Sequence, residues 1–125
     1  MENKYAKGLS DVKTIAVTIA ATAAAVQTAL TPTSGFKARI VSVDVSGKLT
    51  TAPDRVSVYF GTGAAYTTTA ANAICQGFMA ATGEFSRVWG YGEGPVGEVD
   101  EVVSWRTETE TETGMEITIA YTEEK

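Results

Sequence analysis

The sequence predicts an all-β, single-domain protein, either a β-sandwich or a jelly-roll-like barrel. Several short segments alternate apolar with other residues, turn-forming residues separate them, and one segment changes the phase of its alternation. The chain has 125 residues, 44% of them hydrophobic and 20% charged, which suits one domain with one core. We therefore expect a β-domain over residues 13–125, preceded by a polar N-terminal arm over residues 1–12.

The first two predicted strands differ in the regularity of their alternation. In KTIAVTI (13–19) every second residue is a β-branched apolar residue. In GFKARIVSVDVSG (35–47) the apolar residues follow one phase up to Ile40 and the other phase from Val41 onward. This change predicts either a β-bulge or a strand that passes from one sheet to another.

The rest of the chain shows the same kind of pattern. Further strands are predicted at 55–60, 74–79, 84–91, 101–112 and 115–123. The last two are predicted to form a hairpin around the turn at Thr113 and Gly114. The alanine-rich segment AATAAAVQTAL (20–30) fits a short helix and an extended segment equally well, because its threonines offset its helix propensity.

The complete absence of histidine limits the chemistry of this chain. Histidine-based nucleophilic triads are impossible, and a structural zinc site lacks ligands. The glycine-rich stretch GYGEGPVG (90–97) is interpreted as a surface loop, because it contains Pro95 and is followed by β-branched residues, where a phosphate loop is followed by a helix. Asp100 and Glu101 are interpreted as solvated acids. We expect no enzymatic activity, no catalytic residue, no metal and no cofactor.

The single cysteine and the hydropathy of the chain give two further expectations. Cys75 lies among apolar neighbours and is predicted to be a small buried hydrophobe. No segment is apolar enough to span a bilayer, and no signal peptide is evident. The sequence therefore predicts a chain made and folded in a cytoplasm, without a membrane partner.

The stretch RTETETETG (106–114) places three glutamates on one face of a predicted strand: Glu108, Glu110 and Glu112. Such a row can protect a strand from edge-to-edge pairing, or it can dock against a basic surface on another protein. The N-terminal half supplies candidate residues for such a basic surface: Lys37, Arg39 and Lys48.

The charge of the chain is unevenly distributed along the sequence. Residues 1–60 carry seven Lys/Arg against four Asp/Glu, a net charge of +3, and residues 61–125 carry three against eleven, a net charge of −8. Two halves of opposite net charge favour contacts between subunits. The net charge of −5 argues against nucleic-acid binding.

The N-terminal arm, MENKYAKGLSDV, is mostly polar, and Tyr5 and Leu9 stand out as sizeable apolar side chains. Alone it would not fold, and its lysines flank these two residues. We therefore expect Tyr5, Lys7 and Leu9 to anchor the arm on a neighbouring subunit.

In layout the chain resembles small structural proteins of tailed-bacteriophage particles, particularly capsid decoration (head auxiliary) proteins. The resemblance rests on the polar arm, TIAVTIAATAAAVQTALTP, GFKARIVSVDVSG and the closing MEITIAYTEEK, and it covers most of the chain without a specific motif. It implies a compact β-domain on the outer face of the capsid, often a trimer, that binds the major capsid protein or another virion protein. It also implies a location in the virion after synthesis in the host cytoplasm, and a mechanical role in reinforcing the shell.

Two other functions fit the same sequence. A phage tail or other virion assembly protein would have the same composition. A carbohydrate- or ligand-binding module would use exposed aromatic residues, and Trp89 and Tyr91 share one face of a predicted strand. Aromatic residues next to a strand more often belong to the core or to an interface than to a ligand site.

Overall fold

The computed structural model describes residues 11–18, 22–23, 26–48, 54–62, 72–79, 82–107, 111–112 and 115–125. All regular secondary structure in these ranges is β-strand, which confirms the all-β prediction. The strands are β1 (Lys13–Thr18), β2 (Thr22–Ala23), β3 (Gln27–Leu30), β4 (Lys37–Lys48), β5 (Asp54–Phe60), β6 (Ala73–Met79), β7 (Thr82–Val88), β8 (Val103–Thr107), β9 (Thr111–Glu112) and β10 (Met115–Glu124).

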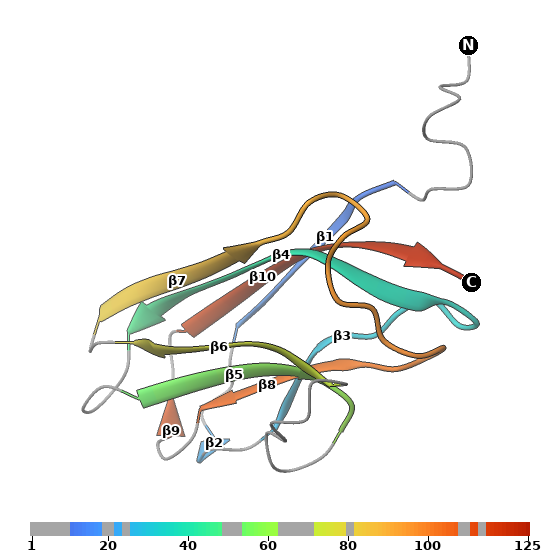
Figure 1. The fold of residues 1–125 in the computed structure, drawn as a ribbon. Coiled ribbons are helices and arrows are strands. Elements are labelled where there is room, and N and C mark those ends of the chain that lie inside the picture. Colours follow the sequence, from blue (N-terminus) through green and yellow to red (C-terminus); the bar gives the residue numbers. More distant parts are fainter. Residues whose placement is uncertain are drawn as a thin grey trace.

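The long strands form two antiparallel sheets that pack face to face (Figure 1). The first sheet has the order β1-β10-β4-β7 and the second has the order β3-β8-β5-β6. Of the connections between these eight strands, the one from β5 to β6 stays within a sheet, and every other connection passes to the opposite sheet. This order is that of a jelly roll. The chain is therefore a β-sandwich with jelly-roll connectivity.

The predicted C-terminal hairpin is wrong. β8 pairs with β3 and β5 in the second sheet, whereas β10 pairs with β1 and β4 in the first. Between them β9 pairs with β2, so the two chain segments that cross between the sheets run beside each other there. Two alternating segments joined by a turn signal look the same in sequence whether the chain folds back or crosses between sheets.

The predicted bulge lies at Val41 of β4. Ser42 is opposite Ala120, and Ile40 is opposite Tyr121, so Val41 has no counterpart on β10. The bulge keeps both Ile40 and Val43 buried although they are three residues apart. The backbone N–H of Trp89 donates to the carbonyl of Val41 at 2.9 Å. The bulge thus explains the change of phase, and β4 remains in one sheet throughout.

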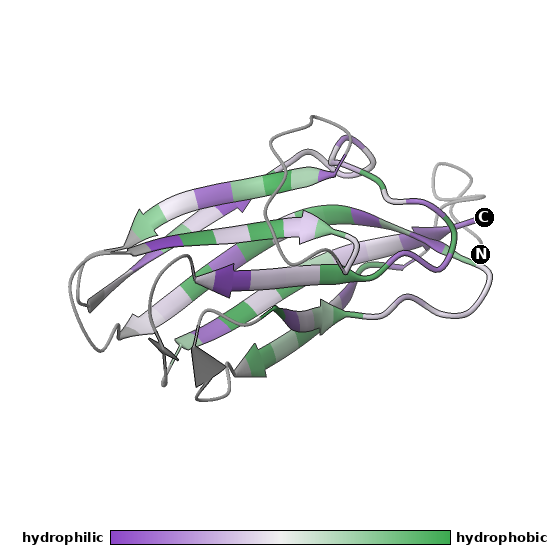
Figure 2. Cartoon of the chain, turned by 90° about the horizontal axis from the view of Figure 1, so that it is seen from below, coloured by the Kyte–Doolittle hydropathy of each residue, from purple (hydrophilic) through white to green (hydrophobic). Residues whose placement is uncertain are grey.

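The core lies between the two sheets, and hydrophobic and hydrophilic residues alternate along the strands that enclose it (Figure 2). Its largest fully buried apolar side chains are Trp105, Leu30, Ile40, Met115, Ile117 and Ile119. β5 is central in its sheet and departs from simple alternation. Val56, Val58 and Phe60 are buried as predicted, but Ser57 and Tyr59 of the opposite row are buried as well.

The described part of the alanine-rich segment is extended, because β2 and β3 fall within it. The alternative that this segment forms a helix is therefore wrong for residues 22–23 and 26–30. Ala29 and Leu30 of β3 are buried in the core. In the described residues no helix is long and apolar enough to cross a membrane.

The two ends of the sandwich differ in what they contain. One end carries the start of β1, the connections 31–36 and 89–102, and the end of β10; we call it the Glu123 end. The opposite end carries the short β2–β9 pair and the end of β4, and we call it the β9 end. The predicted arm at residues 1–12 stays a prediction, since residues 1–10 lie outside the described ranges.

Candidate functional site

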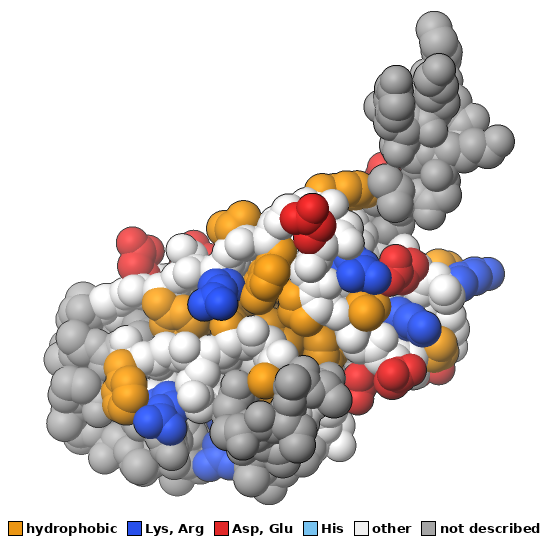
Figure 3. Space-filling view, in the orientation of Figure 1, with side chains coloured by type: hydrophobic (Ala, Val, Ile, Leu, Met, Phe, Trp, Pro, Cys, Tyr) orange, Lys and Arg blue, Asp and Glu red, His pale blue; other side chains and the backbone are white. Residues whose placement is uncertain are grey.

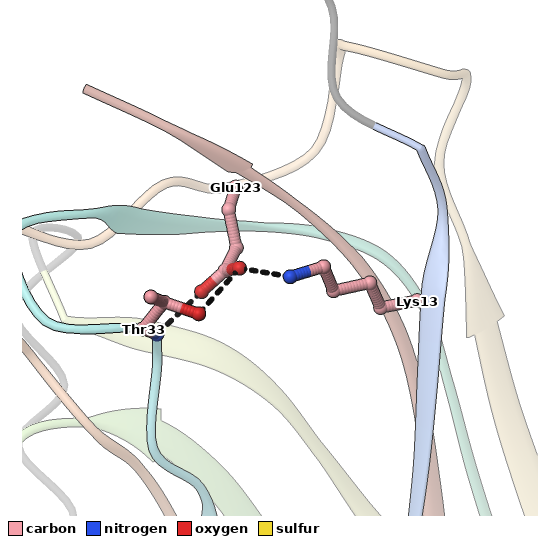
Figure 4. A network of polar contacts seen from close by, with 3 residues as sticks. All are labelled: Lys13, Thr33 and Glu123. Carbon is pink, nitrogen blue, oxygen red and sulfur yellow. Dashed lines mark hydrogen bonds and ion pairs between the residues drawn. The ribbon is translucent and has the colours of Figure 1, made fainter.

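The carboxylate of Glu123 on β10 accepts hydrogen bonds from two other elements of the fold (Figure 4). Its side chain is only 4% exposed. The ammonium group of Lys13 on β1 forms an ion pair with it. From the connection between β3 and β4, Thr33 donates its backbone N–H at 2.5 Å and its hydroxyl at 2.8 Å. One carboxylate thus fastens two strands and a loop at the Glu123 end.

The position of Glu123 follows from the alternation along β10. Met115, Ile117, Ile119 and Tyr121 face the core side of the first sheet, and Glu123 is the next residue in that row. The sequence analysis counted Glu123 only as one acidic charge. Extending the apolar row by two residues would have found it, because an acid at an inward position requires partners.

The pKa values of this pair reflect burial and hydrogen bonding. Burial alone would raise the pKa of the Glu123 carboxyl, but the hydrogen bonds from Lys13 and Thr33 outweigh it and the pKa is lowered. The hydrogen bond to Glu123 raises the pKa of the Lys13 ammonium group. Both groups are therefore held in their charged forms at neutral pH.

A second ion pair joins β4 to the end of β10. The guanidinium of Arg39 donates to Glu124 Oε1 from Nε at 3.1 Å and from Nη2 at 2.7 Å, and to the carbonyl of Gly94 from Nη1 at 2.8 Å. Arg39 therefore binds both the last strand and the loop that follows β7. As a result its donor groups are directed to partners within its own chain.

The loop at 89–102, which contains GYGEGPVG, packs along the first half of β4. The N–H of Ile40 donates to the carbonyl of Pro95 at 2.9 Å, and the N–H of Gly97 donates to the carbonyl of Ala38 at 3.0 Å. A Cβ atom on Gly94 would lie 1.8 Å from the carbonyl oxygen of Ile40, so the loop needs glycine there. The prediction of a loop is confirmed, although Gly94 and Gly97 are buried.

The predicted solvated acids of this loop have structural partners. Asp100 has a positive φ of 64°, and its Oδ1 accepts the N–H of Gly35 at 2.6 Å. Glu101 Oε1 accepts the N–H of Glu98 at 3.0 Å. These carboxylates hold turns at the Glu123 end, which is what acidic side chains do in short connections.

Both ion pairs join the basic half of the sequence to its acidic half. Lys13 and Arg39 belong to the first 60 residues, whereas Glu123 and Glu124 belong to the last few. The jelly roll places β1 and β4 beside β10, so the halves interleave within one sheet. Part of the charge complementarity in the sequence is therefore satisfied inside the chain.

The predicted basic surface of Lys37, Arg39 and Lys48 is not a single patch. Lys37 and Arg39 lie at the Glu123 end of β4, and Lys48 lies at its other end, where it pairs with Thr82. The strand separates Lys37 from Lys48 by roughly 35 Å at about 3.3 Å per residue. Of the other interface candidates, Glu112 lies in β9, and Tyr5, Lys7, Leu9, Glu108 and Glu110 lie outside the described residues.

The two aromatic residues that were predicted to share one face of a strand differ in position and burial. β7 ends at Val88, so Trp89 and Tyr91 lie in the loop and do not share a strand face. Trp89 is partly buried and packs against the core, whereas Tyr91 is 47% exposed.

Cys75 is buried as predicted, and burial raises the pKa of its thiol to about 12. Among the described residues, no group of three or more His, Cys, Asp or Glu side chains could hold a metal ion.

Charged side chains of both signs gather at the end of the molecule where β10 finishes (Figure 3). Elsewhere on this face hydrophobic and polar side chains are interspersed. In the part of the chain that the structure describes, the exposed large hydrophobic side chains are Val12, Phe78, Val88, Tyr91 and Val99. The guanidinium of Arg55 lies 4.8 Å from the ring centroid of Phe78.

Comparisons with known proteins give a likeness at the level of the fold. No protein-family profile matches the sequence, and no curated protein matches it. The fold is similar to a chain in the cryo-EM structure of a virus-like particle of the extra small virus of the giant freshwater prawn, Macrobrachium rosenbergii. The sequences are 9% identical, the TM-score is 0.47, and the match covers 92% of this chain and 78% of the other. The assignment of the jelly roll rests on the strand order and pairing of this chain.

Proposed function

We propose that this chain is a non-enzymatic structural protein of a virus particle, and that it binds the outer surface of a bacteriophage capsid and reinforces it. The observation that carries the proposal is the filled interior of the jelly roll. Jelly rolls serve as viral capsid domains, lectins and cupins. Here Trp105, Leu30 and Ile117 are buried between the sheets, so function resides on the faces, edges and loops.

The phage assignment draws on the layout of the sequence, with a polar arm before a compact β-domain. In this proposal the arm contacts the major capsid protein, and the domain lies on the outer surface. Many identical contacts of modest size, repeated over a shell, add up to a large stabilisation. The three-fold arrangement that the resemblance implies stays a prediction.

The direct test removes the chain from a phage that encodes it. We expect particles to assemble without it but to release their DNA at a lower temperature, and we expect added purified protein to restore the original temperature. A variant that lacks residues 1–12 should keep the melting temperature of the domain within a few degrees and fail to restore the particles. Particles that lack tails, or that are as stable as the wild type, would contradict the proposal.

The glutamate row provides a test of the contact itself. If Glu108, Glu110 and Glu112 dock against a basic surface of the capsid, replacing all three by glutamine should weaken binding roughly tenfold, at about 0.2–1 kcal/mol for each exposed contact. The salt dependence of binding should also become flatter. Binding curves that coincide for the two proteins at low and high salt would leave the row as a guard against aggregation.

A further inference from the structure

The four edge strands of the sandwich differ in how well they are protected against pairing with another chain. Exposed edges offer unpaired backbone groups, and proteins usually block them with charges, bulges or very short strands. β3 has only four residues and a register shift against β8. β6 has a register shift against β5, and β7 carries the exposed charges of Glu84 and Arg87. Three of the four edges thus carry a blocking feature.

β1 is the exception. It is six residues long, pairs with β10 without a register shift, and has no strand on its other side in the described part of the chain. Its one charged residue is Lys13, whose ammonium group is held by Glu123. The ion pair therefore engages the only charge of β1 within its own chain, and the Lys13 side chain remains 46% exposed at the start of the strand.

The side chains along β1 suit the approach of a second strand. Thr14 and Ala16 are exposed and small, and Ile15 and Val17 are only partly buried at the margin of the core. Val12, just before the strand, is 48% exposed. Burying Ile15 and Val17 more completely would remove apolar surface from water.

We propose that β1 is a docking edge for β1 of a second copy of this chain, so that the first sheets of two molecules join antiparallel into one continuous sheet. The partner strand is β1 of a second copy because the other three edges of this chain are blocked. In addition, β1 can pair with itself without placing two charges opposite each other. A two-fold pair of β1 strands also forms a closed dimer, because neither copy keeps a free β1 edge that could extend the sheet into a fibre.

The alternation of side chains restricts the register of this pair. Residues directly opposite each other point to the same face, so the inward row of one copy must meet the inward row of the other. A two-fold axis at Ile15 satisfies this condition. It places Ile15 against Ile15 of the second copy and Thr14 against Ala16 of the second copy. No two charges face each other in this register.

Charge placed on the outward row tests the pair and its register together. The double variant Thr14→Lys with Ala16→Lys puts lysine against lysine twice, and we expect its dimer dissociation constant to rise roughly tenfold or more in sedimentation velocity experiments over a concentration series. The variant Thr14→Glu with Ala16→Lys puts unlike charges opposite each other, and we expect it to dimerise at least as tightly as the wild type. Ser86→Lys on the exposed face of β7 is the matched control and should leave dimerisation unchanged.

Melting temperatures should remain close to the wild-type value in all these variants, because the substituted positions are exposed. A chain that stays monomeric at millimolar concentration would overturn the proposal, and so would an oligomer that is indifferent to the lysine pair. The experiment contains no capsid, so its outcome is independent of the test of the proposed function.

Discussion

Lys13 and Glu123 lie 110 residues apart in the chain and form an ion pair between neighbouring strands of the first sheet. The two groups are unequally exposed, because the Lys13 side chain is 46% exposed and that of Glu123 is 4% exposed. The carboxylate is therefore the partner that cannot turn to water. Removing the lysine would leave this buried charge without its cation, whereas the lysine itself can be solvated.

Replacing Glu123 by glutamine should lower the free energy of unfolding by about 1–2 kcal/mol, because charge-assisted hydrogen bonds are replaced by neutral ones. Lys13→Met should cost at least as much, because the buried carboxylate then keeps only the two hydrogen bonds from Thr33 and has no cation. Glu116→Gln, at an exposed position of the same strand, is the control and should change stability little. Urea unfolding of the three variants measures the order. Equal stability of Glu123→Gln and the wild type would contradict the structural role of this carboxylate.

The pH dependence of stability should carry the signature of Glu123. Its pKa is lowered in the folded protein from the ordinary value of 4.5, so the unfolded chain takes up the proton more readily. The contribution to stability is therefore complete above the ordinary value and is lost as the pH falls through the folded pKa. As the pH is lowered from about 7 to about 3, the free energy of unfolding should fall less steeply in Glu123→Gln than in the wild type. Parallel pH profiles would be evidence against this assignment.

Gly94 should tolerate no side chain. An added Cβ atom would meet the backbone of Ile40, which cannot move without displacing β4, and we expect Gly94→Ala to cost roughly 3 kcal/mol or more. Gly83→Ala in β7 is the matched control, because a Cβ atom there has no other atom within 4 Å. It should change stability by no more than about 1 kcal/mol. Thermal melting distinguishes the two, and a stable Gly94→Ala would show that the loop at 89–102 can shift.

Cys75 should be unreactive in the folded protein. With the pKa of its thiol raised to about 12 from 9.0, the thiolate fraction at pH 8 is lower by about a thousandfold. We expect an aromatic disulfide reagent to modify Cys75 in urea and to leave it unmodified in native buffer over the same time. Rapid stoichiometric modification of the native protein would mean that β6 opens readily.

The strands were predictable because alternation with a period of two is a local property of the sequence. KTIAVTI predicted β1, and the change of phase after Ile40 predicted either a bulge or a passage between sheets, of which the structure has the bulge at Val41. Which strands pair was not predictable, because a turn signal after β8 does not say whether the chain folds back or crosses to the other sheet. The interleaving of acidic and basic halves follows from that pairing, and so the ion pairs of Lys13 and Arg39 could not be foreseen from charge counts.

The place of β10 in the first sheet bears on how a newly made chain matures. This strand follows all the others in the sequence, yet it lies between β1 and β4 and is the sheet partner of β1. While a ribosome is still translating residues 115–124, β1 therefore has no sheet partner, and the strand that connects it to β4 is missing. Folding of this domain is completed only after β10 has left the exit tunnel, so the outer edge of β1 reaches its final geometry only once β10 is in place.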